Sequence, residues 1–159
     1  MEYINPLFKN NEIVKPKKTE EQKVKQTDRI RAVRNDKTHN VKFPVTSVVR
    51  LKLKSYCKQA ARLYRALRKD SLSQTKFNTL LLRYGLKNNH IQRWDHEYKD
   101  TKVYMHTNIL ETEYEEIGGP HGFSVRKGLS DRKVVYQVML SVLNWLEGEG
   151  DIEKIIQQS

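Results

Sequence analysis

The most restrictive feature of this sequence is a strict alternation of residue types over residues 45–54. One set of alternate positions is largely apolar: Val45, Ser47, Val49, Leu51 and Leu53. The other set is largely basic: Thr46, Val48, Arg50, Lys52 and Lys54. A period of two residues that includes β-branched side chains is typical of a strand buried on one face. The alternation therefore predicts an amphipathic strand over residues 45–54.

Two amphipathic helices are expected after this strand. Ser55 is a suitable N-cap for the first, whose apolar positions recur at helical spacing: Tyr56, Ala60, Leu63 and Leu67. Its basic residues lie off that stripe and either solvate the helix or contact a polyanion: Arg62, Arg65, Arg68 and Lys69. Ser73 is a suitable N-cap for the second helix, and Gly85 is a suitable end for it.

The strongest pattern in the second half of the chain is a helix over residues 131–147, with Ser130 as its N-cap. This helix is apolar on more than one face, so it must be buried, either against another subunit or inside a self-contained domain. Most of residues 91–116 is expected to be helical, residues 118–122 a turn and residues 123–126 a short strand. Asp151 begins a short final helix.

The charge is divided unevenly along the chain. Residues 1–90 carry 22 Lys and Arg against 7 Asp and Glu, a net charge of +15, whereas residues 91–159 carry 8 against 12, a net charge of −4. A basic half favours a polyanion such as nucleic acid, because each neutralised phosphate releases counterions. The alternative is a charged surface without a partner. Residues 1–42 are expected to form a flexible basic N-terminal arm, because they bury too little apolar surface to offset their ordering entropy.

The order of strand, helix, turn and helix resembles the ribbon-helix-helix family of DNA-binding proteins, which includes the Arc and methionine repressors. The resemblance covers residues 45–87 and is carried by residues 48–54, the apolar stripe of the first helix and the Leu72-Ser73-Gln74-Thr75 entry to the second. It implies a dimer in which two strands pair into a ribbon that enters the DNA major groove. The expected fold class is mostly α with one β-strand per chain, as a dimeric ribbon-helix-helix domain at residues 43–89 and a mainly helical oligomerisation or partner domain at residues 90–159.

The resemblance also implies the site residues. The family's base-reading positions match three alternate outward residues of the strand: Val48, Arg50 and Lys52. DNA phosphate contacts are expected from Lys54 and from the start of the second helix: Ser73, Gln74, Thr75 and Lys76. The alternative for the strand residues is a solvated face, and for Ser73 a plain helix cap.

No catalytic residue, metal ligand or cofactor is expected. The spacing of His90, Asp95, His96 and Glu97 matches no recognised metal or catalytic motif. Cys57 is the one cysteine, which favours a reducing compartment. No apolar run approaches the roughly 20 residues that span a bilayer. We therefore expect a cytoplasmic protein without a membrane partner.

Together these features predict a sequence-specific, double-stranded DNA-binding protein that forms a homodimer, or a tetramer if residues 90–159 join dimers. The favoured role is a relaxosome accessory protein, bound near a plasmid origin of transfer in conjugation, with a relaxase as its partner. A transcriptional repressor and a plasmid partition or copy-control factor are alternatives of the same class. A non-enzymatic module that binds protein or RNA is the alternative from another class.

Overall fold

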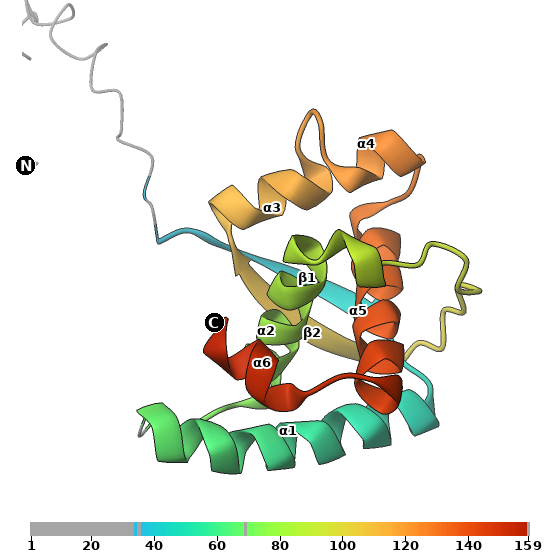
Figure 1. Cartoon of the computed structure of the whole chain (residues 1–159). Helices are drawn as coiled ribbons and strands as arrows, with labels where there is room; N and C mark the ends of the chain where they lie inside the picture. The colour runs from blue at the N-terminus through green and yellow to red at the C-terminus, as the bar shows by residue number, and fades with distance from the viewer. Residues whose placement is uncertain (1–33, 35, 69, 159) are drawn as a thin grey trace, which may run out of the picture. The chain divides into compact units, whose positions relative to one another are not determined.

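The computed structural model describes residues 34, 36–68 and 70–158. Residues 1–33, most of the expected basic arm, lie outside the described residues. The helices and strands follow one another in this order (Figure 1): β1 (Thr38–Pro44), α1 (Ser47–Arg68), α2 (Gln74–Lys87), the 3-10 turn η4 (Asn89–Ile91), β2 (Tyr104–Leu110), α3 (Glu111–Gly118), α4 (Phe123–Lys127), α5 (Asp131–Gly148) and α6 (Ile152–Gln157).

The segment expected to be a strand is helical, which overturns the central prediction. Residues 47–54 form the first two turns of α1. Thr46 precedes them as a cap, because its hydroxyl accepts a hydrogen bond from the Val49 N–H at 3.3 Å. A ribbon between two chains needs these residues to be extended, so the predicted ribbon-helix-helix fold class, with one strand per chain, is wrong.

Two periods compete in this segment, and the helical one prevails. Val49 and Leu53 are four residues apart, as the buried face of a helix requires. The same spacing continues along the face of α1 that turns to the core, through Cys57, Ala60 and Tyr64. Leu51, which the strand pattern places on the apolar face, is 68% exposed. The longer 3.6-residue period therefore decides the structure, because it buries more apolar surface than ten alternating residues can.

The sheet forms within the chain. β1 pairs antiparallel with β2, so that Thr38 lies opposite Leu110 and Pro44 opposite Tyr104. β1 contains residues 38–42, which the sequence pattern assigns to the flexible arm. The inner face of the sheet is buried and packs against helices, whereas the outer face exposes polar side chains. α2 also covers the free edge of β2, because Asn78 Nδ2 donates to the His106 carbonyl at 3.1 Å and the Asn108 N–H donates to Thr79 Oγ1 at 2.8 Å.

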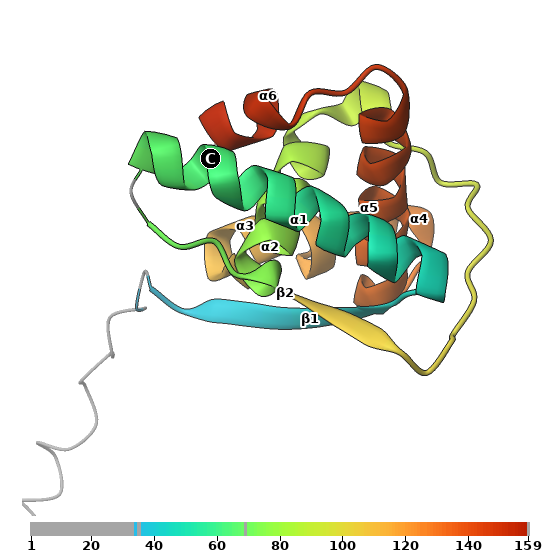
Figure 2. The same cartoon turned by 90° about the horizontal axis from the view of Figure 1, so that it is seen from below.

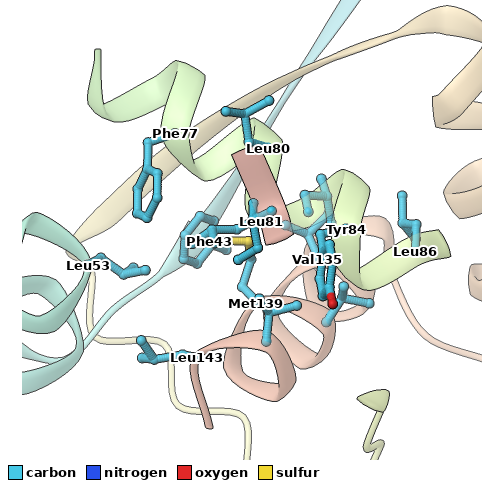
Figure 3. Close-up of a cluster of buried hydrophobic side chains, with 14 of the residues drawn as sticks. Phe43, Leu53, Phe77, Leu80, Leu81, Tyr84, Leu86, Val135, Met139 and Leu143 are labelled. Carbon is cyan, nitrogen blue, oxygen red and sulfur yellow. The ribbon is translucent and has the colours of Figure 1, made fainter. Parts of the chain in front are cut away.

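One hydrophobic core joins the two expected domains. Figure 3 shows Phe43 of β1 and Leu53 of α1 beside Leu81 of α2 and Met139 of α5. Residues from 43–89 and from 90–159 thus contribute to the same cluster of buried side chains. α5, which the sequence pattern places at an oligomer interface or in a domain of its own, is buried against α2 and β1 of its own chain.

The other expectations have mixed outcomes. The N-caps predicted at Ser73 and Ser130 and the helix start predicted at Asp151 are confirmed, since each side chain accepts a backbone N–H of the helix that follows. The predicted helix over residues 91–116 is wrong for most of its length, because residues 92–103 are irregular and residues 104–110 form β2. Residues 123–126 are helical rather than extended. None of the described helices is both long and apolar enough to cross a membrane.

Candidate nucleic-acid interface

A line of basic side chains runs along the exposed side of α1. Arg50, Lys54, Lys58 and Arg62 follow one another at intervals of four residues, and Arg65 comes three residues later. Each residue turns an α-helix by about 100°, so these five side chains lie within an arc of roughly 120°. All five are exposed. We call this set of five residues the α1 basic face.

The α1 basic face has no charge partner in the described part of the chain. α1 contains seven basic residues and no acidic one, and the ion pairs of the structure involve none of the five. Like charges three or four residues apart on a helix destabilise it by about 0.2–0.5 kcal/mol per pair. The five residues make four such pairs, a cost of roughly 1–2 kcal/mol that an anionic ligand would relieve.

The three residues predicted to read bases do not share a face. Val48 and Lys52 each lie two residues from Arg50, which places them about 160° away from it around the helix. Lys52 is half-buried, and its ammonium lies 2.6 Å from the Glu147 carboxylate of α5. Lys52 therefore connects α1 to α5, while Arg50 alone of the three belongs to the α1 basic face.

The N-terminal end of the α1 basic face borders two hollows. One, of about 200 Å³, lies between α1, the start of α2 and β2, and its lining includes Arg50, Lys54, Gln74, Thr75, Asn78 and His106. The other, of about 580 Å³, lies on the side of residues 101–103 and is also lined by Arg50 and Lys54. These two cations therefore stand in a concave part of the surface, where they can surround an anionic group from more than one side.

The residues of the predicted phosphate site at the start of α2 are divided between two hollows. Ser73 is the N-cap, since its hydroxyl accepts the Lys76 N–H at 3.2 Å. Gln74 Nε2 donates to Asn78 Oδ1 at 3.0 Å and to the Leu53 carbonyl at 3.4 Å, which ties α2 to α1. The Lys76 ammonium lies 4.8 Å from the centre of the Tyr64 ring. The structure thus brings Lys54, Gln74 and Thr75 together at the smaller hollow, and Ser73, Thr75 and Lys76 together at a separate hollow of about 310 Å³.

Because residues 45–54 were expected to form a strand, part of the α1 basic face was not predicted. Lys58 belongs to no site in the sequence analysis, although it completes the four-residue spacing between Lys54 and Arg62. If a helix is assumed to begin at residue 47, the sequence itself shows that these basic residues recur with one helical period.

One group of acidic side chains lies on α3, far from α1. Figure 1 shows α3 and α4 at the top and α1 at the bottom, and Figure 2, seen from below, has α1 in front of them. Of the four glutamates of α3, Glu111 is paired with Lys37 and His39, and Glu113 with Arg83. Glu115 and Glu116 are exposed. Arg126 and Lys127 of α4 line a common hollow with Glu115 and Glu116, and Glu147 lies beside α1, so both ends of the described fold carry acidic and basic groups.

Ser141 and His96 form an arrangement that resembles a catalytic pair. Ser141 Oγ lies 3.3 Å from His96 Nε2, but it also accepts the Arg93 N–H at 2.8 Å and lies 2.7 Å from the Gln137 carbonyl. The serine is 2% exposed, so no substrate reaches it. The Gln137 amide binds both the N–H and the carbonyl of His96. These bonds hold residues 93–96 against α5, and the role of the cluster is structural.

Cys57 and the histidines offer no other reactive site. Burial raises the pKa of the Cys57 thiol, which disfavours the nucleophilic thiolate. Within residues 34, 36–68 and 70–158, no three side chains of His, Cys, Asp and Glu come close enough to hold a metal ion.

The function of the α1 basic face has to be argued from its geometry and charge. Comparisons with models of protein families, with curated protein sequences and with solved structures found no match to this chain.

Proposed function

We propose that this protein binds double-stranded DNA and that the α1 basic face contacts the phosphates. The observation that carries the proposal is the line of five exposed cations on one helix, none of them paired within the described residues. A helix that only faces solvent does not require its basic residues to lie on one face. A mixture of basic and acidic residues would stabilise it more. The cost in helix stability is compensated when a polyanion replaces the repulsion with attraction.

The dimensions of the α1 basic face suit a duplex. The 16 residues from Arg50 to Arg65 span about 22 Å along the helix axis, at a rise of about 1.5 Å for each step from one residue to the next. Phosphates follow one another at about 3.4 Å per strand along B-DNA, so this length matches roughly six base steps. A rigid helix that carries regularly spaced charges therefore meets several phosphates at once, whereas a flexible acidic polypeptide would first have to be ordered.

The specific biological roles expected from the sequence depended on a ribbon formed by residues 46–54. Because these residues are helical, nothing favours plasmid transfer, repression or partition over one another. We therefore propose DNA binding without a more specific role. The alternative from another class is a module that binds an acidic protein. A comparison of DNA with an acidic polypeptide as the ligand distinguishes the two functions.

The test is the salt dependence of binding to a fluorescent 20-base-pair duplex, measured by anisotropy. Five phosphate contacts predict that log K falls with log salt with a slope of about −4 to −5, at roughly −0.9 per contact. The double substitution Lys58→Gln/Arg62→Gln should weaken binding at least tenfold and make the slope shallower by about 2.

The matched control is Arg126→Gln/Lys127→Gln on α4, which removes the same charge from two exposed residues at the other end of the fold. It should leave both affinity and slope close to those of the unchanged protein. Equal losses for the two double variants would contradict the proposal, as would tighter binding to polyglutamate than to the duplex at the same salt concentration.

A further inference from the structure

The outer face of the β1–β2 sheet is an array of polar side chains. Asn40 lies directly opposite Asn108, and Lys42 directly opposite His106, in the antiparallel register. All four side chains are exposed. Neither strand contains an acidic residue. The array therefore offers amide, imidazole and ammonium groups to a partner, and no carboxylate that would repel an anion.

The residue types on this face are poorly suited to stabilising a sheet. Asparagine is depleted in strands, and cross-strand stability comes mainly from aromatic, β-branched or oppositely charged pairs. A pair of asparagines and a pair made of lysine and histidine supply none of these. Threonine or valine at the same positions would keep the exposed face and strengthen the sheet. Recognition of a ligand is one reason to retain such side chains.

Several hydrogen-bonding groups of the array remain available. His106 Nδ1 lies 3.0 Å from Asn40 Oδ1, and within the described residues His106 Nε2 and the Asn40 NH₂ group make no hydrogen bond. Asn108 uses only its backbone N–H, toward Thr79. The Lys42 ammonium lies 4.7 Å from the centre of the Tyr104 ring, whose hydroxyl donates to Asp100 at 2.7 Å. Neighbouring groups thus hold the side chains in place without saturating them.

The array is continuous with the α1 basic face. His106 of the sheet and Arg50 and Lys54 of α1 line the same hollow of about 200 Å³. A ligand that covers the outer face of the sheet therefore also contacts Arg50 and Lys54 of α1.

We infer that the outer face of the sheet enters the major groove and reads base edges, while α1 binds the phosphates at the groove's rim. This inference rests on the proposed function. The major groove is about 12 Å wide and admits a two-stranded antiparallel ribbon. Asparagine forms a bidentate pair with adenine, and lysine hydrogen-bonds guanine. The residues assigned to base reading are Asn40, Lys42, His106 and Asn108.

The experiment selects sites from a random duplex library with the full chain at a stated salt concentration, and then measures affinity for the selected site and for an unrelated duplex. The test variant is Asn40→Thr/Asn108→Thr, because threonine favours strands and should preserve the fold. Its thermal unfolding verifies that the fold is retained. The variant should lose roughly 5- to 150-fold of its affinity for the selected site, the range for one bidentate contact. Its affinity for unrelated DNA and its salt slope should stay unchanged.

Lys58→Gln/Arg62→Gln is the reciprocal variant and should weaken binding equally on all sequences while the base preference is kept. Selection of a site without any preferred base would overturn the inference and leave the proposed function standing. So would an unchanged preference in Asn40→Thr/Asn108→Thr, or a change of oligomeric state in that variant as its only effect. Absence of binding to any duplex would overturn both.

Discussion

Gly85 lies in α2 at the point where this helix packs against α5. A Cβ atom at this position would lie 2.5 Å from Val138 Cγ1 and 2.7 Å from Val142 Cγ2. These distances leave no room for a methyl group between two packed helices. The sequence pattern uses this glycine to end the helix, but α2 continues through it to Lys87. Its role is close packing between the two helices.

Gly85→Ala should therefore destabilise the protein, although alanine normally stabilises a helix by about 1 kcal/mol relative to glycine. We expect a net loss of roughly 1–3 kcal/mol, since overpacking outweighs helix propensity. Gly148→Ala is the matched control, because a Cβ there would meet no atom within 4 Å. Urea denaturation measures both variants, and a stabilised Gly85→Ala protein would show that the packing of α2 on α5 is looser than described.

His96 gives the fold a dependence on pH. Burial lowers the pKa of its imidazole, and the opposing effect of Asp95 does not cancel this shift. The folded state therefore favours the neutral ring, and below the ordinary pKa of about 6.5 the unfolded chain binds more protons at this residue. Stability should fall as the pH drops from 7.5 to 5, because the unfolded state gains the proton first.

The measurement is the urea midpoint at pH 7.5 and pH 5 for the unchanged protein and for His96→Gln. The drop between the two pH values should be smaller in His96→Gln. His121→Gln serves as the control, since His121 is exposed in a turn and its loss should leave the drop unaltered. A drop of the same size in all three proteins would assign the pH dependence to other groups.

At the scale of elements, α1 combines a buried apolar face with an exposed basic one. Lys58 lies four residues from both Lys54 and Arg62. Lys58→Glu replaces two repulsive pairs with two attractive ones, which should stabilise the folded protein by roughly 1–2 kcal/mol and raise Tm. The same change should weaken DNA binding more than tenfold, because it removes one phosphate contact and adds a repulsive charge.

Calorimetry of the free protein and anisotropy with the duplex measure these two effects of Lys58→Glu. Opposite changes in stability and affinity indicate that α1 keeps its repulsive charges for a ligand. A variant that gains stability and binds DNA as before would remove α1 from the interface.

At the scale of the whole described fold, the exposed Glu115 and Glu116 of α3 add a long-range repulsion that should slow the approach of a polyanion. Glu115→Gln/Glu116→Gln should accelerate association with DNA at low salt, where the Debye length is about 30 Å at 0.01 M. At 0.15 M salt the Debye length is about 8 Å, and the effect should disappear. Stopped-flow association at the two salt concentrations measures this difference, and an acceleration that persists at high salt would indicate a local contact instead.

Much of the helical structure could be predicted from local signals. The caps at Ser73, Ser130 and Asp151 and the long helix that follows Ser130 depend on residues close together in the sequence, so periodicity and capping chemistry suffice to find them. The strands were harder to recognise. Residues 38–44 alternate weakly, and their partner, residues 104–110, lies more than sixty residues away.

The candidate site could likewise be predicted only in part. The basic character of residues 50–65 is present in the sequence, but their arrangement on a single face depends on whether the segment is a helix or a strand. Under the strand pattern Val48, Arg50 and Lys52 share a face, whereas in α1 the shared face belongs to Arg50, Lys54 and Lys58. The identity of the interface residues therefore follows from the secondary structure.

By itself the sequence determined where the charge lies, where α2, α5 and α6 begin and which helix must be buried, because these properties arise from neighbouring residues. The tertiary structure alone decided three further points: that residues 47–54 are helical, that Thr38–Pro44 pairs with Tyr104–Leu110, and that α5 is buried by its own chain. Each depends on contacts between residues far apart in the sequence. Residues 45–54 fit both the two-residue period of a strand and the 3.6-residue period of a helix. Only the packing of Leu53 into the core distinguishes the two structures.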